Sequence, residues 1–389
     1  MVLEEEQKRI RCVVMRGGTS RALFVMRSEL PAQPELRDRV ILRMYGSPDV
    51  RQIDGMGGAD PLTSKLAIIG PTTREDADVD YTFAQVSFDQ PLVDYKGNCG
   101  NISSAVGPFA IDEGLVDPVE PTTTLRIHQT NTDCILTAEV PVVNGKAAVK
   151  GNYHIDGVPG TGARIDLDFS DTGGAVTGRI LPTGKPVDRL TVPGVGSIDV
   201  SVVDAGNPCV FVRAVDLGIR GTETPDEIDA DRELNDQIER IRGTVASGIG
   251  LVGHWQDAAR ESPYIPFFAL VSPPADYVDY TTGQEVPAEQ VDFVARLLFM
   301  LRMHKAYPVT GTVCTGTASR IPGTLVHEAT RPESRDNRLT RIGHPAGVIE
   351  VEAVVDSCNG VRLQRASLGR TARRIMEGYV FVPWSTLVG

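Results

Sequence analysis

The amino-acid sequence lacks any apolar run close to the roughly 20 residues that a membrane-spanning helix needs. It also lacks an excess of positive charge. Its 39 lysines and arginines stand against 51 aspartates and glutamates, which gives a formal net charge of −12 at pH 7. A nucleic acid has to be met by a basic surface, so this balance argues against a nucleic-acid partner. We therefore expect neither a membrane nor a nucleic acid among the partners of this chain.

Cysteine is also sparse and shows no metal-binding spacing. Six cysteines are scattered over 389 residues, and no CxxC or HxxxH pattern occurs. Such scattering is neither a disulfide framework nor a zinc pattern. The polar, acidic residues 1–11 do not resemble a secretory signal. We expect free thiols, no metal site and a reducing compartment, the cytoplasm.

Glycine and proline, by contrast, are frequent, with 39 and 26 residues. They separate short β-rich runs, for example 81–88, 124–128, 134–140, 198–203 and 210–215. Helical patterns are fewer, at 35–45, 102–113, 230–242, 290–305 and 319–328. This mixture predicts an α+β fold in which a mostly antiparallel sheet wraps around a few central helices.

The chain is long enough for two domains, and two pairs of similar segments support a duplicated architecture. The segment CGNISSAVGP (99–108) resembles CTGTASRIPG (314–323), and RGGTS (16–20) is echoed by AGNP (205–208). Both pairs occur in the same order. The Pro- and Gly-rich stretch 182–196 marks a boundary, which predicts one domain at 1–188 and another at 189–389.

Three glycine-dense segments in the first 110 residues carry reactive side chains. They are MRGGTS (15–20), DGMGGA (54–59) running on to TSK (63–65), and GNCGNISS (97–104). The second lacks the GxGxxG and GxxxxGK[ST] spacings of nucleotide loops, so a carboxylate fits these turns better than a phosphate cofactor.

Cys99 lies in GNCGN (97–101), which is followed by the predicted helix at 102–113. A helix N-terminus binds a carboxylate and lowers a nearby thiol pKa. A buried, inert cysteine in a tight turn fits the same pattern. Lys65 precedes the apolar run 66–70, where partial burial would lower its pKa toward the range of a general base. A strand-edge lysine with a solvated head group is the alternative.

His304 and Lys305 lie at the end of a predicted helix, shortly before Cys314, and either could meet an anionic ligand. A capping or packing role for His304 fits the pattern as well. Cys314 takes the repeat position of Cys99, which leaves open an epimerase that uses these two thiols as opposed bases. A non-catalytic carboxylate-binding protein is a third alternative.

Four segments, MRGGTS (15–20), QIDGMGGA (52–59), TSK (63–65) and GNCGN (97–101), together resemble the PrpF family of 2-methylaconitate cis-trans isomerases. The likeness continues through LPTG (181–184), PGVG (193–196), AGNP (205–208) and IPGTLV (321–326), and runs from about residue 10 to 383. The family also includes 4-oxalomesaconate tautomerases, methylitaconate isomerases and aconitate isomerases.

The resemblance implies a diaminopimelate-epimerase-like fold. In it, two pseudo-symmetric domains each roll a mostly antiparallel sheet around a central helix, and the site lies in the cleft between them. The last strands can return to the first domain. The resemblance also implies an enzyme without metal or organic cofactor, which acts on a small unsaturated polycarboxylate. The oligomeric state stays open, a homo-oligomer included.

The resemblance further implies an acid/base pair, Lys65 and Cys99. Substrate carboxylates are expected on Arg16, Gly17, Gly18, Thr19, Ser20, Ser64, Gly100, Asn101, His304, Gly316 and Thr317. The chain departs from close methylaconitate isomerases at 60–62, at Arg21 and at Cys314, which bears on the substrate. The predicted reaction is an allylic 1,3-proton shift, a cis-trans isomerisation, or both, with Lys65 as base and Cys99 as acid or second proton carrier.

Overall fold

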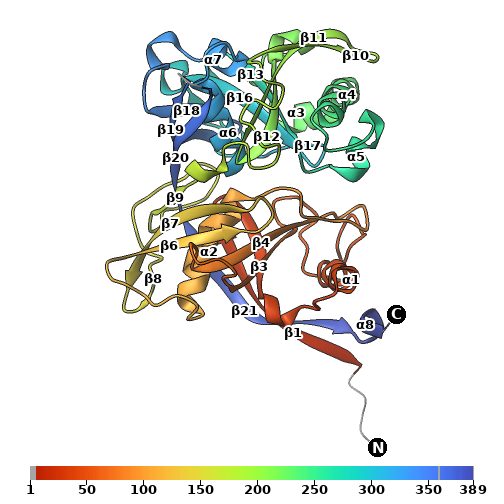
Figure 1. Ribbon diagram of the computed structural model, residues 1–389, viewed down its shortest axis with the longest axis vertical. Coiled ribbons are helices and arrows are strands. Elements are labelled where there is room, and N and C mark those ends of the chain that lie inside the picture. Colours follow the sequence, from red (N-terminus) through yellow and green to blue (C-terminus); the bar gives the residue numbers. More distant parts are fainter. Residues whose placement is uncertain (1–5, 358–359, 389) are drawn as a thin grey trace, which may run out of the picture.

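The computed structural model describes residues 6–357 and 360–388, and in it the chain forms two lobes stacked along the long axis. The first half of the sequence builds one lobe, and most of the second half builds the other (Figure 1). Cys358 lies outside the described residues. The other five cysteines are free and buried.

The sheet of the first lobe contains seven main strands in the described residues, and each pairs with the next one in the order given below. The six successive pairings are antiparallel, parallel, antiparallel, parallel, antiparallel and antiparallel. The strands, in that order, are β1 (Gln7–Gly17), β2 (Ser20–Met26), β3 (Lys65–Pro71), β4 (Val79–Val86), β6 (Thr122–Gln129), β7 (Cys134–Val143) and β9 (Ile165–Asp168).

The second lobe repeats the same succession of antiparallel and parallel pairings. Its strands are β11 (Gly196–Ala205), β12 (Asn207–Arg213), β13 (Phe267–Ser272), β16 (Phe293–Phe299), β18 (Leu339–His344), β19 (Gly347–Asp356) and β20 (Arg362–Arg370). Shorter strands are β5 (Val93–Asp94), β8 (Lys146–Ala147), β10 (Asp188–Val192), β14 (Tyr277–Val278), β15 (Glu285–Val286) and β17 (Arg302–Met303). The domain boundary at residue 188 stays a prediction, and β10 begins there.

Each sheet rolls around one buried helix, α2 (Gly100–Asp112) or α6 (Val309–Ser319). Small and apolar residues occur on all sides of both helices, and every residue of α6 is buried. A helix that is apolar all round has to be covered all round, so the sheet curves about it. The remaining helices are α1 (Pro34–Tyr45), α3 (Pro225–Ala230), α4 (Arg232–Gly248), α5 (Ala258–Glu261), α7 (Leu325–Ala329) and α8 (Ser385–Val388).

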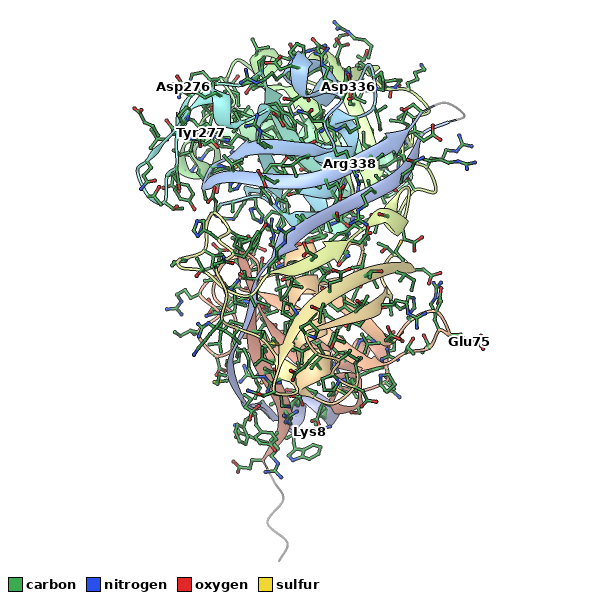
Figure 2. All side chains as sticks on the ribbon, turned by 90° about the vertical axis from the view of Figure 1, so that its left-hand side faces the viewer. Lys8, Glu75, Asp276, Tyr277, Asp336 and Arg338 are labelled. Carbon is green, nitrogen blue, oxygen red and sulfur yellow. The ribbon has the colours of Figure 1, made fainter. Side chains whose placement is uncertain are left out.

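The last two strands, β20 and β21, link the lobes. β20 pairs with β19 in the second lobe and with β9 in the first. The next strand, β21 (Ala372–Pro383), pairs with β1 along its whole length. Figure 2 shows this blue strand descending from the lobe that carries Tyr277 and Arg338 to the lobe that carries Lys8. Thr371, between β20 and β21, therefore lies where the chain passes from one lobe to the other.

Two predicted helices are wrong. Residues 290–305 form β16 and β17, and all seven residues of β16 are buried. A strand that is buried on both faces reads as a continuous apolar run, which periodicity alone cannot distinguish from a buried helix. Residues 319–328 are divided between the end of α6 and α7, because Pro322 and Gly323 interrupt the helix. The helix predicted at 35–45 is confirmed as α1.

Candidate active site

The N-terminus of α2 brings two of the glycine-dense segments together. Cys99 is the N-cap residue of α2 and is 5% exposed. The turn between β1 and β2 packs on the first turn of α2, where the Thr19 amide donates to Asn101 Oδ1 at 3.3 Å. Asn101 Nδ2 donates in return to Thr19 Oγ1 at 3.1 Å. The backbone amides at the start of α2 therefore face the same region as the MRGGTS turn.

Glycine is required at two of these positions. Gly18 has φ +50°, and a Cβ placed there would lie 2.0 Å from Asn101 Oδ1. A Cβ on Gly100 would lie 2.4 Å from Val309 Cγ1, the first residue of α6. The N-termini of the two central helices thus meet at the boundary between the lobes, and the small residues of GNCGN permit that approach.

Lys65 is the first residue of β3 and is 1% exposed. Its Nζ donates to Gln85 Oε1 at 2.6 Å and lies 5.2 Å from the ring centres of Phe83 and Phe299. Burial lowers the Lys65 pKa, while the charge of Cys99 and a side-chain hydrogen bond to it work in the opposite direction. Lys65 therefore lies near Cys99 in a buried, aromatic setting. Its Nζ is 5.8 Å from the Tyr264 ring centre, and the Tyr264 hydroxyl donates to the carbonyl of Asn98, the neighbour of Cys99, at 2.9 Å.

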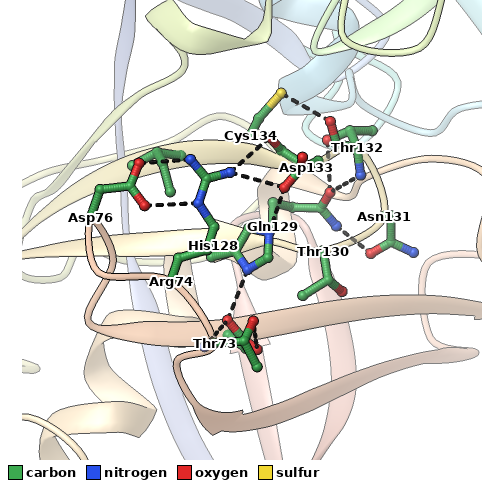
Figure 3. A network of polar contacts seen from close by, with 12 residues as sticks. Thr73, Arg74, Asp76, His128, Gln129, Thr130, Asn131, Thr132, Asp133 and Cys134 are labelled. Atoms are coloured by element: carbon green, nitrogen blue, oxygen red, sulfur yellow. Dashed lines mark hydrogen bonds and ion pairs between the residues drawn. The ribbon is translucent and has the colours of Figure 1, made fainter.

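The residues around Lys65 fix its position. Gln85 Nε2 donates to the carbonyl oxygens of Ser64 at 3.0 Å and Pro61 at 3.1 Å, so it braces the TSK turn. The Ser64 hydroxyl donates to Gln52 Oε1 at 2.7 Å, which joins the QIDGMGGA segment to the same turn. A second network of polar contacts holds the β6–β7 turn (Figure 3). From this turn, Asn131 Oδ1 accepts the Phe83 amide and Asn131 Nδ2 donates to the Phe83 carbonyl, both at 2.8 Å.

His304 lies in the same cluster and is neutral. Burial, followed by the nearby Lys65 charge, lowers its pKa to about 3. Nδ1 accepts the Ala306 amide at 3.0 Å, which assigns the proton of the neutral ring to Nε2. His344 has the same arrangement: burial lowers its pKa, and its Nδ1 accepts the Ala346 amide at 3.2 Å. Sequence reasoning missed His344, although the two short segments HKA and HPA share this spacing.

Arg16 holds the MRGGTS turn. Its guanidinium donates to the carbonyl oxygens of Gly18 at 3.0 Å and Thr371 at 2.9 Å, and to Thr371 Oγ1 at 3.0 Å. The turn is therefore tied to the passage between the lobes. The Ser20 hydroxyl is buried without a hydrogen-bond partner. Direct contacts of Arg16 and Ser20 with a substrate stay predictions, as do those of Gly17 and Thr19.

The structure does not bring Gly316 and Thr317 to the N-terminus of a helix. α6 begins at Val309, so both residues lie two turns inside it, and Gly316 packs on Val351 of β19. The equivalence of Cys314 with Cys99 is wrong, because Pro308 is the N-cap residue of α6. Cys314 Sγ instead donates to the Val203 carbonyl at 3.2 Å inside the second lobe.

A cavity of about 260 Å³ lies next to this cluster at the lobe boundary. Among its lining residues are Thr19, Ala306, Tyr307, His344 and Arg370. In the described part of the chain, no group of three or more His, Cys, Asp or Glu side chains is placed to hold a metal ion. No helix within 6–357 or 360–388 is long and apolar enough to cross a membrane.

Comparison with known proteins identifies the family of this chain. Residues 7–383 match the model of the family described as PrpF protein. The chain belongs to the PrpF family. It is 55% identical to 3-methylitaconate isomerase of Eubacterium barkeri, over 98% of this chain and 100% of that protein. It is 39% identical to 2-methyl-aconitate isomerase of Shewanella oneidensis, over 97% and 98% of the two chains. This family member is therefore an isomerase or tautomerase.

Solved structures show the fold. A crystal structure of methylitaconate-delta-isomerase matches with a TM-score of 0.80 at 55% identity, over 99% of this chain and 98% of that one. A hydroxyproline epimerase from Agrobacterium vitis matches with a TM-score of 0.60 at 11% identity, over 98% and 93% of the two chains. The mixed α+β fold of this PrpF-family protein is thus diaminopimelate-epimerase-like.

Proposed function

We propose that this protein catalyses an allylic 1,3-proton shift on a small unsaturated di- or tricarboxylate without a cofactor, in the cleft between its two lobes. The observation that carries the proposal is the buried Lys65, which lies near Cys99, the N-cap residue of α2. Two proton carriers at this spacing suit a reaction that removes a proton from one carbon and adds one to another.

Lys65 acts as the base. Burial favours its neutral amine, which removes the proton from the carbon between a carboxylate and the carbon–carbon double bond. The C–H electron pair enters the conjugated system and gives a delocalised dienolate. Lys65 is then an ammonium whose charge is shielded by the rings of Phe83 and Phe299.

Cys99 acts as the acid. Its thiol delivers a proton to the far carbon of the allylic system, so the double bond moves by one position and the dienolate is consumed. A Cys99 thiolate and a Lys65 ammonium remain, and transfer of the proton from the ammonium to the thiolate restores the starting pair. Rotation about the weakened bond of the dienolate also permits cis-trans exchange. The roles of the two groups reverse with the direction of the reaction.

The start of α2 stabilises the dienolate. The amides of Gly100 and Asn101 are among the first N–H groups of the helix, which have no partner within it. They carry the positive end of the helix dipole and are held in place before the reaction begins. Pre-oriented donors of this kind contribute about 10²–10³ in rate in other enzymes.

We infer that the substrate is a dicarboxylate of the methylitaconate type. The support is the 55% identity to 3-methylitaconate isomerase, against 39% to 2-methyl-aconitate isomerase and 38% to 4-oxalomesaconate tautomerase of Pseudomonas putida. On such a diacid, the proton leaves the methine carbon and arrives at the terminal methylene carbon, which becomes a methyl group.

The test is ¹H NMR of the purified protein in D₂O with methylitaconate, methylaconitate, aconitate and oxalomesaconate. We expect one acid to isomerise with deuterium incorporation. Lys65→Met and Cys99→Ser should abolish the conversion, whereas the matched changes Lys96→Met and Cys134→Ser should retain it. Turnover that persists in both site variants would remove the pair from the mechanism. Binding without proton exchange would favour a non-catalytic carboxylate-binding protein.

A further inference from the structure

Arg370 is a buried cation without an anionic partner. It is the last residue of β20 and is 4% exposed. Its Nη1 donates to the neighbouring Gly369 carbonyl at 3.1 Å, and its Nε has no hydrogen-bond partner. Among the residues that the structure describes, it forms no ion pair with a carboxylate. A buried charge left in this state is costly unless something pairs with it.

The Arg370 side chain lines the cavity of about 260 Å³ at the lobe boundary, together with Thr19, Tyr307 and His344. Asp156 and Glu350 also line this cavity. The Asp156 charge opposes the lowering of the Arg370 pKa, but both oxygens of this carboxylate have other partners. Asp156 Oδ2 accepts the Val348 amide at 2.6 Å, and Oδ1 lies 3.2 Å from His154 Nε2. Burial lowers the Arg370 pKa to about 10, so the guanidinium is charged at neutral pH.

This cavity adjoins the Lys65–Cys99 cluster at two points. Thr19 lines it and holds Asn101 in the first turn of α2. On the other side, Ala306 lines it, and His304 lies close enough to both Lys65 and Arg370 for either charge to lower its pKa. Arg370 thus lines the cavity from the strand that links the lobes. Lys65 does not line the cavity itself and adjoins it through His304.

We propose that Arg370 binds the substrate carboxylate that is remote from the carbon losing its proton, and so sets the requirement for a second acid group. This inference rests on the proposed function and names the side chain that selects a dicarboxylate. A planar guanidinium with free donors matches a carboxylate in a bidentate manner, which a lysine cannot reproduce. Arg16 is unsuited to this task, because three of its hydrogen bonds go to Gly18 and Thr371.

The experiment combines variants with a truncated ligand. Arg370→Lys and Arg370→Gln are compared with Arg373→Gln, an exposed arginine three residues further along the chain. Binding of methylsuccinate, a saturated diacid that cannot undergo the allylic shift, is measured by calorimetry beside its two mono-methyl esters. Thermal melts establish that each variant is folded.

We expect Arg370→Gln to weaken methylsuccinate binding about 10–100-fold, the loss of one charge-assisted hydrogen-bond pair. Arg370→Lys should give an intermediate loss that appears mainly in KM, and Arg373→Gln should match the wild type. On the wild type, one of the half-esters should bind as weakly as the diacid binds to Arg370→Gln. Equal binding of the diacid and both half-esters by the wild type, a comparison that needs no variant, would overturn the inference.

The two proposals fail separately. If acids bind in an Arg370-dependent manner but none exchanges a proton in D₂O, the proton-shift function is wrong and the carboxylate site stands. If an acid turns over and Arg370→Gln leaves its KM and kcat unchanged, the function stands and Arg370 is not the anchor.

Discussion

Gly18→Ala tests how the MRGGTS turn is placed on α2. A Cβ at Gly18 would lie 2.0 Å from Asn101 Oδ1, and real Cβ contacts essentially never fall below 3.0 Å. The turn and the Asn101 side chain must therefore separate by about 1 Å, which breaks the pair of hydrogen bonds between Asn101 and Thr19.

The expected loss of stability has two parts. A non-glycine residue at φ +50° costs about 1–2 kcal/mol. The two Asn101–Thr19 hydrogen bonds contribute about 0.5–1.5 kcal/mol each, so the free energy of unfolding should fall by about 2–5 kcal/mol. Displacement of the MRGGTS turn from Asn101 by about 1 Å should also lower kcat/KM by roughly 10²-fold.

The assay is denaturant unfolding together with steady-state kinetics, and Gly283→Ala is the matched control. Gly283 has φ +74°, but a Cβ there would meet nothing within 4 Å. The control should show the backbone cost of about 1–2 kcal/mol and full activity. If both variants lose equal stability and both retain kcat/KM, the packing of the turn on α2 does not position the site.

Further predictions concern the pH dependence and the side chains around Lys65. Burial holds the Lys65 pKa below 10.5, and the neutral amine is the base. We therefore expect kcat/KM to be low at pH values below that pKa and to rise as the pH passes through it. A pH–rate profile without this rise contradicts the assignment of Lys65 as the base. The unfolded chain binds the Lys65 proton more tightly than the folded one, so this residue destabilises the fold below pH 10.5 by about 1.4 kcal/mol for each unit of pKa depression. Any stability that Lys65→Met gains at pH 7 should therefore shrink toward pH 10.5 in denaturant titrations. Cys314→Ala should keep most of its turnover, because Cys314 lies inside the second lobe; loss of turnover would revive the two-thiol epimerase. Asn131→Ala should lower the free energy of unfolding by about 1–3 kcal/mol, because it leaves the backbone of Phe83 unpaired.

The sequence predicts those features of the structure that depend on neighbouring residues in the chain. The apolar residues after GNCGN predict a helix at 102–113, and the structure begins this helix two residues earlier, at Gly100. The apolar run after Lys65 is compatible with a buried or a solvated amine, and the structure shows that the amine is buried. Neighbours in the chain indicate the helix, but they do not decide the burial of Lys65.

Features that depend on distant strands were not predictable in this way. The apolar run 293–299 is a strand because β13 and β18 flank it. The similarity of CGNISSAVGP (99–108) to CTGTASRIPG (314–323) pairs Cys99 with Cys314, whereas α6 begins at Val309. Proline is common at the start of a helix, so Pro308 is the local signal for this start. The residues around Arg370 in the sequence do not indicate that its side chain lines the cavity, because this position depends on the passage of the chain between the lobes.

The position of deuterium in the substrate tests the central claim most directly. Methylitaconate would be incubated in D₂O with the wild type, Lys65→Met and Cys99→Ser, and followed by NMR at the methine and at the methylene-derived carbon. The account predicts deuterium at both positions with the wild type and at neither with Lys65→Met. With Cys99→Ser, it predicts exchange at the methine without isomerisation. Methine exchange that persists in Lys65→Met at the wild-type rate would contradict the assignment of Lys65 as the base.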